Sequence, residues 1–326
     1  MKPKNILLIR TDRIGEFILT TPAINAFRAG FPDAEITLAV SAASYEAAEG
    51  NPSVDRIIKL DPKKDLDSPF RMARFIASLR EQRYGICAVF NPSKAVNVAV
   101  FLAGIPVRIG YDRKLGFLLN RPVADRKHLC EKHEVEYNLD IARAAGIDAK
   151  PSVPVFTVNA QDETGAARIA RENGIREGER FIAVHPGTSN PEKIWPAERF
   201  GRLCAMIEKD LGAKVVLVGG QEEKPASIEV ARHSGRPLYD LTGKLGLKEF
   251  GSLLRKAKAL VSCDSGPVHI SVAVGTPVVA LFGESRKGGS SVRWGPYGRG
   301  HTVIGRPMVS DITVEEVFTA VKGING

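Results

Sequence analysis

The segment SCDSGPVH at 262–269 combines residue types that bind anions. The apolar run at 259–263 predicts a buried strand, and Pro267 is typical of the first turn of a helix. The backbone N–H groups expected at this helix start belong to Ser265, Gly266 and Val268. A helix N-terminus binds phosphate groups through such N–H groups. We therefore predict an anion site following Asp264, while His269, in the first turn, has a ligand role and a structural role as equal alternatives.

A second loop with similar chemistry, HPGTSNPEKIWP, occupies 185–196. It follows the predicted strand Phe181–His185 and carries the hydroxyls of Thr188 and Ser189 together with the positive charge of Lys193. Free backbone N–H groups and a cation in one irregular loop favour binding of a pyrophosphate. An ordinary loop between a strand and a helix is an equal alternative.

Two glycines and two acids follow the next predicted strand in the sequence VGGQEE. Gly219 and Gly220 permit a close approach of the backbone to a ligand. An acid at this position of a βαβ unit often binds ribose hydroxyls, which makes Glu222 a candidate and Glu223 its substitute. A solvated helix start explains the same acids equally well.

The first strand–helix turn, TDRIGE at 11–16, places the carboxylate of Glu16 where ligands bind in parallel α/β sheets. The spacing allows a catalytic role, although an acid near a helix N-terminus is also a common stabilising choice. The turn lacks the GxGxxG pattern of dinucleotide-binding proteins.

Several other chemistries find no support in the sequence. The chain has no GxxxxGK[ST] loop, no HExxH pair and no GxSxG elbow. Asp65-Leu66-Asp67 has the spelling of a metal-binding DxD, but it lies in a polar stretch where such tripeptides are common. The cysteines are scattered without a CxxC pair, at positions 87, 130, 204 and 263. We predict no metal and no cofactor.

Alternating strand and helix patterns position these motifs in the first half. The predicted strands are 5–11, 34–40, 56–60, 86–90 and 107–110. The predicted helices are 15–29, 41–49, 68–82, 94–103 and 133–145. Repeated βαβ units of this kind imply a parallel sheet with helices on both faces.

The second half repeats the pattern after a polar, proline-containing linker at about 147–162. The predicted strands are 181–185, 214–218, 259–263 and 277–282, and the predicted helices are 197–211, 222–234, 247–257, 267–274 and 313–322. The sequence therefore predicts two α/β domains, residues 1–158 and 159–326, with the final helix able to pack on the first.

Composition narrows the class of partner. The chain has 326 residues, 44% of them hydrophobic, and a formal net charge of +9 that is spread over both halves. A basic balance favours acidic partners, but nucleic acid usually requires a clustered stripe of charge. No apolar run approaches the length of a membrane span, and the first apolar run is interrupted by charges, unlike a signal peptide. We expect a cytoplasmic protein.

Taken together, the motifs resemble those of the glycosyltransferase family 9 heptosyltransferases of lipopolysaccharide synthesis. The resemblance rests on ILLIRTDRIGEFILTTPAI, HPGTSNPEKIWP, VGGQEE and VSCDSGPVHISVAVGTPVVALFG, with support from AGIPVRIGYDRK and WGPYG. It extends over nearly the whole chain, and the motif around 262–283 is the most specific.

The resemblance implies a GT-B fold, in which two Rossmann-like domains face each other across a cleft. The acceptor binds to the N-terminal domain and the sugar nucleotide, typically ADP-heptose, to the C-terminal one. The implied reaction is an inverting transfer without an obligatory metal. The implied acceptor is an acidic glycolipid such as the lipopolysaccharide core, which suggests peripheral attachment to the inner face of the inner membrane.

Family membership also implies roles for individual residues. Glu16 matches the acidic catalytic base, and Lys193 matches the lysine that contacts the donor phosphates and sugar. The other residues implied in donor binding are Thr188, Ser189, Glu222, Leu245 beneath the adenine, Asp264, Ser265, Gly266 and His269. Basic residues that would attract the acidic acceptor are Arg13, Arg113 and Lys114.

One departure from the family pattern leaves other functions open. The family usually has Asp after the glycine of the first turn, whereas this chain has Glu16, whose carboxylate reaches about one methylene farther. An epimerase or hydrolase of sugar nucleotides and a non-catalytic sensor are the alternatives. The sequence does not give the oligomeric state.

Overall fold

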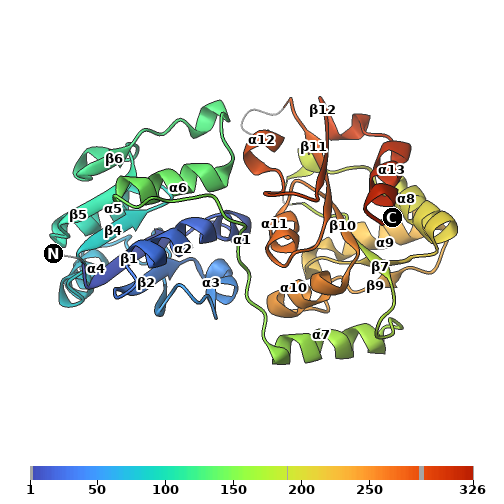
Figure 1. The fold of residues 1–326 in the computed structure, drawn as a ribbon, viewed down its shortest axis with the longest axis horizontal. Helices are drawn as coiled ribbons and strands as arrows, with labels where there is room; N and C mark the ends of the chain where they lie inside the picture. The colour runs from blue at the N-terminus through green and yellow to red at the C-terminus, as the bar shows by residue number, and fades with distance from the viewer. Residues whose placement is uncertain (1–2, 189, 286–289, 326) are drawn as a thin grey trace. The chain divides into compact units, whose positions relative to one another are not determined.

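The computed structural model describes residues 3–188, 190–285 and 290–325, which form two compact units, Met1–Thr157 and Val158–Gly326 (Figure 1). Each unit is built on one six-stranded sheet in which every pairing is parallel. Helices flank both sheets. This architecture confirms the predicted α/β fold.

The first sheet has the strand order β3-β2-β1-β4-β5-β6. Its strands are β1 (Asn5–Arg10), β2 (Glu35–Val40), β3 (Arg56–Lys59), β4 (Ile86–Val89), β5 (Val107–Tyr111) and β6 (Arg121–Val123). Its helices are α1 (Ile14–Ile18), α2 (Thr21–Gly30), α3 (Ala42–Ala48), α4 (Pro69–Glu81), α5 (Lys94–Leu102) and α6 (Glu134–Ala144). This is the Rossmann order, in which the chain reverses direction of growth between β1 and β4.

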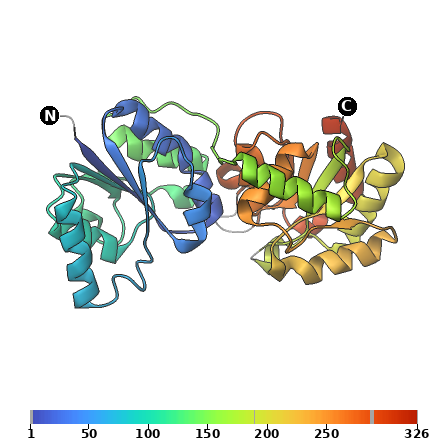
Figure 2. The same ribbon diagram turned by 90° about the horizontal axis from the view of Figure 1, so that it is seen from below.

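Helices cover both faces of the first sheet (Figure 2). Leu7 and Ile9 of β1 pack with residues of α4 and α5 in one core cluster. Because side chains alternate along a strand, Ile6 and Leu8 face the opposite side. All four are fully buried, which explains why β1 is an uninterrupted apolar run.

The second sheet has the order β9-β8-β7-β10-β11-β12, which repeats the Rossmann order with β7 and β10 at the point of reversal. Its strands are β7 (Phe181–His185), β8 (Lys214–Leu217), β9 (Tyr239–Asp240), β10 (Ala259–Cys263), β11 (Val278–Gly283) and β12 (Thr302–Arg306). Its helices are α7 (Ala160–Glu172), α8 (Ala197–Leu211), α9 (Lys224–Ser234), α10 (Leu247–Lys256), α11 (Gly266–Ala273), α12 (Ser291–Trp294) and α13 (Val314–Asn325).

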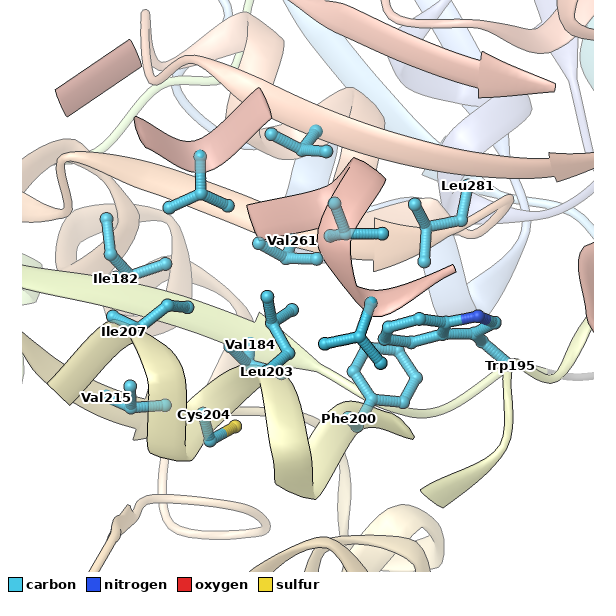
Figure 3. Close-up of a cluster of buried hydrophobic side chains, with 14 of the residues drawn as sticks. Ile182, Val184, Trp195, Phe200, Leu203, Cys204, Ile207, Val215, Val261 and Leu281 are labelled. Carbon is cyan, nitrogen blue, oxygen red and sulfur yellow. The ribbon is translucent and has the colours of Figure 1, made fainter. Parts of the chain in front are cut away.

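The core of the second unit fixes the loop that follows β7 (Figure 3). Trp195, at the end of this loop, is fully buried and packs edge-on against Phe200 of α8, with ring centroids 4.8 Å apart. Its indole N–H donates to the carbonyl of Ile312 at 3.0 Å. An amphipathic ring with its one donor satisfied is a strong anchor, so the loop is tied to the core at its C-terminal end.

The structure divides the helix that the sequence predicts over 15–29 into α1 and α2. Thr20 and Thr21 lie at the break, where their hydroxyls donate to the backbone carbonyls of Glu16 and Ile18 at 2.8 and 2.7 Å. Pro22 opens α2. Threonine hydroxyls that bond to the backbone and a proline without an N–H both favour a new helix start.

Other differences concern the edges of each unit. The predicted linker already includes the start of α7, which Asn159 caps by accepting from the backbone N–H groups of Gln161 and Asp162. The edge strands β6, β9 and β12 were not predicted. The final helix, α13, packs on α8 and on β10–β12 within the second unit. Packing of this helix on the first domain, which the sequence analysis allowed, stays a prediction.

Candidate sugar-nucleotide and catalytic sites

The two anion-binding motifs of the second unit leave neighbouring strands. β7 and β10 pair in parallel, with His185 in register with Ser262, so the loops that follow them start side by side at the carboxyl edge of the sheet. This is the reversal point of the strand order, where ligands bind in open α/β sheets. The topology thus brings together loops that are about 75 residues apart in the sequence.

Lys193 and Asp264 form an ion pair between these two loops. Lys193 ends the short 3-10 helix η3 (Pro191–Lys193), and Asp264 follows β10 directly. The hydroxyl of Thr188 donates to the carbonyl of Asp264 at 3.5 Å. Ser189 lies outside the described residues. The structure therefore brings Lys193, Thr188 and Asp264 into one cluster, as their motifs suggested, with the lysine charge balanced by a carboxylate.

Ser265 begins α11 without capping it. The residue occupies the N-cap position with extended backbone, but its hydroxyl makes no capping hydrogen bond. Gly266 and Pro267 form the first turn, and both Ser265 and Gly266 are half-buried. The N-terminus of this helix is therefore free of a serine cap, which would otherwise satisfy one of its first N–H groups. His269 lies in the same turn and is only 4% exposed, so little of its ring is accessible.

Behind Ser265 lies a buried chain of hydrogen bonds that sequence reasoning missed. Nε2 of His185 is 3.0 Å from Oε1 of Glu223, and Nδ1 is 3.0 Å from Oγ of Ser262. The Ser262 hydroxyl lies 2.9 Å from that of Ser265. Ser262 is fully buried, so it has no access to a substrate as a nucleophile, although the order of groups is that of a Ser-His-Glu triad.

Both carboxylate oxygens of Glu223 accept a hydrogen bond, Oε1 from His185 and Oε2 from Gly220. Burial alone would raise its pKa, but hydrogen bonding and attraction to His185, with the backbone N–H of Gly220 donating at 2.7 Å, lower the pKa below its ordinary value. A Cβ atom at Gly187 or Gly219 would come within 2.4 Å of this carboxylate, so both glycines make room for it. Glu222 is exposed on the same turn, η4 (Gln221–Glu223), whereas Glu223 is half-buried.

Leu245 is half-buried in the loop between β9 and α10. Since β9 is the parallel neighbour of β8, its following loop emerges at the same edge of the sheet as the motifs above. Its aliphatic side chain offers an apolar surface suited to a planar base.

Glu16 lies in α1, directly after β1, at the corresponding reversal point of the first sheet. Its side chain is half-buried, and its pKa is raised by burial and then by repulsion from Asp12, against a smaller opposing attraction to Arg10. A carboxyl group with a raised pKa binds a proton more readily, as a general base must. Arg13, the N-cap residue of α1, is exposed.

A buried charge network lies behind Glu16. Arg10 is 2% exposed, and its guanidinium donates to Asp12 at 2.6 Å and lies 3.5 Å from Glu134 of α6. Lys127 pairs with the same Glu134 carboxylate at 2.6 Å and lies over the ring of Tyr111. The sequence offers no signal for this network, because charged residues are usually assigned to the surface.

Arg113 and Lys114 are exposed on the loop that follows β5. Arg113 pairs with Asp125 at 2.9 Å, and Lys114 adopts a left-handed backbone with φ of 50°. Because β5 is parallel to β1, their loop emerges from the same edge of the first sheet as Glu16.

The two acids of the DxD tripeptide have structural partners. Asp65 accepts from the backbone N–H of Asp61 at 2.7 Å, and Asp67 pairs with Arg71 of α4. Within the described ranges, no group of three or more His, Cys, Asp and Glu side chains is arranged to hold a metal ion. Nor does any helix in the described part of the chain have the length and apolar character needed to span a membrane.

Comparison with known proteins gives a consistent result. Residues 72–318 match the sequence model of the family described as glycosyltransferase family 9 (heptosyltransferase). Lipopolysaccharide heptosyltransferase 3 of Escherichia coli is 25% identical over 292 residues, which cover 87% of this chain and 83% of the relative.

Solved structures show the same fold. A family 9 glycosyltransferase from Veillonella parvula matches with a TM-score of 0.88 at 22% identity, covering 99% of this chain and 97% of that one. The E. coli ADP-heptose LPS heptosyltransferase II matches with a TM-score of 0.80 at 23% identity, covering 98% of each chain. Two Rossmann-like units with these neighbours show the predicted GT-B fold. Since the family match covers most of the sequence, including both candidate anion-binding loops, this chain belongs to glycosyltransferase family 9.

Proposed function

We propose that this chain transfers a heptose, with inversion and without a metal, from ADP-heptose to a lipopolysaccharide core or another surface-glycan acceptor. Membership in glycosyltransferase family 9 supports glycosyl transfer. The names of the similar E. coli proteins support heptose as the sugar, ADP-heptose as the donor and lipopolysaccharide as the acceptor class.

The observation that carries the proposal is the Lys193–Asp264 pair beside the uncapped start of α11. In the proposed complex, the diphosphate binds at the N–H groups of Ser265 and Gly266, and Lys193 balances the charge that develops on the departing nucleotide. The remaining donor contacts in this proposal are Thr188 and Ser189 at the pyrophosphate, Glu222 at the ribose, Leu245 at the adenine and His269 near the sugar. The second unit is therefore the proposed donor domain.

Glu16 is the proposed general base, which accepts the proton of the acceptor hydroxyl as that oxygen attacks the anomeric carbon. Its raised pKa supports this role. Arg13, Arg113 and Lys114 are exposed cations on the same unit and are proposed to attract the acidic acceptor. The first unit is thus the proposed acceptor domain.

The proposed location is the cytoplasm, with peripheral attachment to the inner face of the inner membrane. The net charge of +9 supports attraction to an anionic surface.

The test is a transfer assay with ADP-heptose and lipopolysaccharide from a heptose-deficient strain. ADP release and the mass of the lipopolysaccharide are followed together, and the anomeric configuration of the product is determined by NMR spectroscopy. The proposal expects ADP release that depends on the acceptor, addition of one heptose, and an inverted configuration. A chelator is expected to leave the rate unchanged.

Two controls distinguish the alternative functions. ADP-heptose alone should be stable in the presence of the protein, because release of free heptose without acceptor would indicate a hydrolase. Tight binding of ADP-heptose without turnover on any lipopolysaccharide would indicate a sensor. Either result would contradict the proposed transfer.

A further inference from the structure

In the hydrogen-bond chain from Glu223 to Ser265, the proton on Nδ1 of His185 decides which hydroxyls donate and which accept. Glu223 accepts from Gly220 through Oε2 and from His185 through Oε1, so its carboxylate is satisfied in the ionised form. Nε2 of His185 therefore carries a hydrogen in both protonation states of the ring. Only Nδ1, which lies 3.0 Å from the Ser262 hydroxyl and 3.5 Å from the Ser265 hydroxyl, changes between acceptor and donor.

With a neutral His185 ring, the chain of hydroxyls points inward. Nδ1 then accepts from the Ser262 hydroxyl at 3.0 Å, and the Ser262 oxygen accepts from the Ser265 hydroxyl at 2.9 Å. Ser265 would present only oxygen lone pairs to the start of α11. This arrangement disfavours an anion, which needs donors.

With a protonated ring, the chain reverses. Nδ1–H donates to Ser262, whose own hydroxyl then donates to Ser265 or to the carbonyl of Cys263, 3.0 Å away. The Ser265 hydroxyl becomes free to donate outward, beside the backbone N–H groups of α11. The positive charge on the buried ring also attracts an anion at this position.

Burial of His185 and Ser262 makes the hydrogen bonding of Ser265 depend strongly on the protonation state of His185. His185 is 1% exposed and Ser262 is fully buried, so bulk water does not replace a missing partner at either group. Ser265 is the half-exposed end of the chain, and its hydroxyl is not used to cap α11. The chain therefore connects a buried titratable ring to the surface where the diphosphate is proposed to bind.

We propose that the Glu223–His185 pair couples diphosphate binding at Ser265 to protonation of His185, so that the His185 ring takes up a proton from solution as the sugar nucleotide binds. The inference rests on the proposed donor site. Histidine is the residue type that changes charge near neutral pH. Because the bound state holds more protons than the free state, the affinity for the donor falls as pH rises.

The charges around His185 are consistent with this coupling. Glu223 contacts the ring directly from η4, with its Oε1 atom 3.0 Å from Nε2 of His185. Asp264 and Lys193 lie beyond Ser265 at the ends of β10 and η3 and balance each other as an ion pair. Glu222 is exposed on the turn that carries Glu223. The incoming diphosphate thus adds net negative charge near the ring, which favours its protonation.

The test is calorimetry of ADP-heptose binding to the full-length protein, without acceptor, in two buffers that differ in ionisation enthalpy. The phosphates of this diester carry fixed charges near neutral pH, so protons exchanged with the buffer report on the protein. The expected result is an uptake of up to one proton, and an affinity that weakens by up to tenfold per pH unit as pH rises.

Three variants test whether His185 is the group that takes up the proton on donor binding. His185→Gln should bind with no proton uptake and with an affinity independent of pH. Ser265→Ala, at a half-exposed position, should reduce the uptake without the risk of unfolding that a buried substitution carries. His233→Gln is the matched control, because His233 also lies near a glutamate, Glu229, but on α9, and it should behave as the wild type.

The outcomes separate the inference from the proposed function. Binding of ADP-heptose without proton uptake, or uptake that persists in His185→Gln, would overturn the coupling and leave the donor site intact. Failure of the wild type to bind ADP-heptose at all would overturn the donor site and the coupling together.

Discussion

At the scale of single residues, Glu16 shows how a carboxyl group is adjusted by its surroundings. Burial and the charge of Asp12 raise its pKa, whereas the partly neutralised charge of Arg10 offsets this only in part. The pKa of the proposed base is therefore raised first by burial and then by Asp12, and the contribution of Asp12 can be measured.

Replacing Asp12 by Asn should move the acidic limb of the pH–rate profile to lower pH. A general base is active when ionised, so activity rises with pH through its pKa. Removing the repulsion from Asp12 lowers the pKa of Glu16, and the rise then occurs at a lower pH. Profiles of kcat for wild type, Asp12→Asn and the exposed control Asp33→Asn test this. A limb that stays in place, or moves to higher pH, would contradict the assigned influence of Asp12.

Lys193→Ala should weaken donor binding and slow transfer. A hydrogen bond to a charged group contributes roughly 1.5–3 kcal/mol, or about 10- to 150-fold in affinity. The loss also leaves the carboxylate of Asp264 without its cation near the proposed diphosphate. Donor KM and kcat are compared with those of Lys209→Ala, an exposed lysine on α8. Unchanged values of both constants would remove Lys193 from the site.

The sequence located some of these residues but not their partners. The sequence predicted Lys193 and Asp264 as members of the candidate donor site, because both lie in loops that follow recognisable strands. The pairing of His185 with Glu223 was not predicted, since it depends on how β7, η4 and β10 pack together. In the structure, Gly187 and Gly219 leave room for the Glu223 carboxylate, but the sequence analysis assigned neither glycine to that purpose.

At the scale of elements, the central strands were easier to predict from the sequence than the short edge strands β6 and β9. Central strands such as β1, β7 and β10 are buried on both faces and appear as apolar runs. The edge strand β9 has only two residues, and β6 has a proline and two exposed positions. Short edge strands lack the hydrophobic pattern on which prediction depends.

The packing of α6 against the end of β1 depends on the buried carboxylate of Glu134. Glu134→Gln would leave the charges of Arg10 and Lys127 buried without their common partner. Breaking a buried ion pair typically costs about 3–5 kcal/mol. Urea unfolding should show that Glu134→Gln lowers the free energy of unfolding by this amount.

The control lies on the same helix. Glu136 pairs with Arg143 at 3.4 Å with both side chains partly exposed, and such surface pairs contribute about 0–1 kcal/mol. Equal losses of unfolding free energy for Glu134→Gln and Glu136→Gln would show that the Arg10–Glu134–Lys127 network does not stabilise the fold.

At the scale of the whole molecule, the chain uses the same Rossmann strand order twice. Each repeat places its candidate site where the order reverses, after β1 in the first unit and after β7 and β10 in the second. The class of fold followed from alternating patterns in the sequence. The strand order did not, because sequence periodicity carries no information about which strands are neighbours.

Net charge leads to a prediction for the molecule as a whole. With a net charge of +9, the protein should bind vesicles that contain anionic lipid and should be released by high salt. Exposed charges are screened over about 8 Å at physiological ionic strength and over shorter distances at higher salt. Co-sedimentation with anionic and neutral vesicles across a salt series measures this. Binding that persists in high salt would point to a non-electrostatic attachment.

The central claim is that Glu16 accepts the proton of the acceptor hydroxyl in a glycosyl transfer. The most direct measurement is kcat of Glu16→Gln at saturating ADP-heptose and acceptor, with the melting temperature of the same sample. The account predicts a fall in kcat of about 10²–10⁴, with donor affinity and melting temperature near those of the wild type. A Glu16→Gln variant with a wild-type kcat would contradict it, and a lowered melting temperature with normal turnover would show instead that Glu16 only stabilises the start of α1.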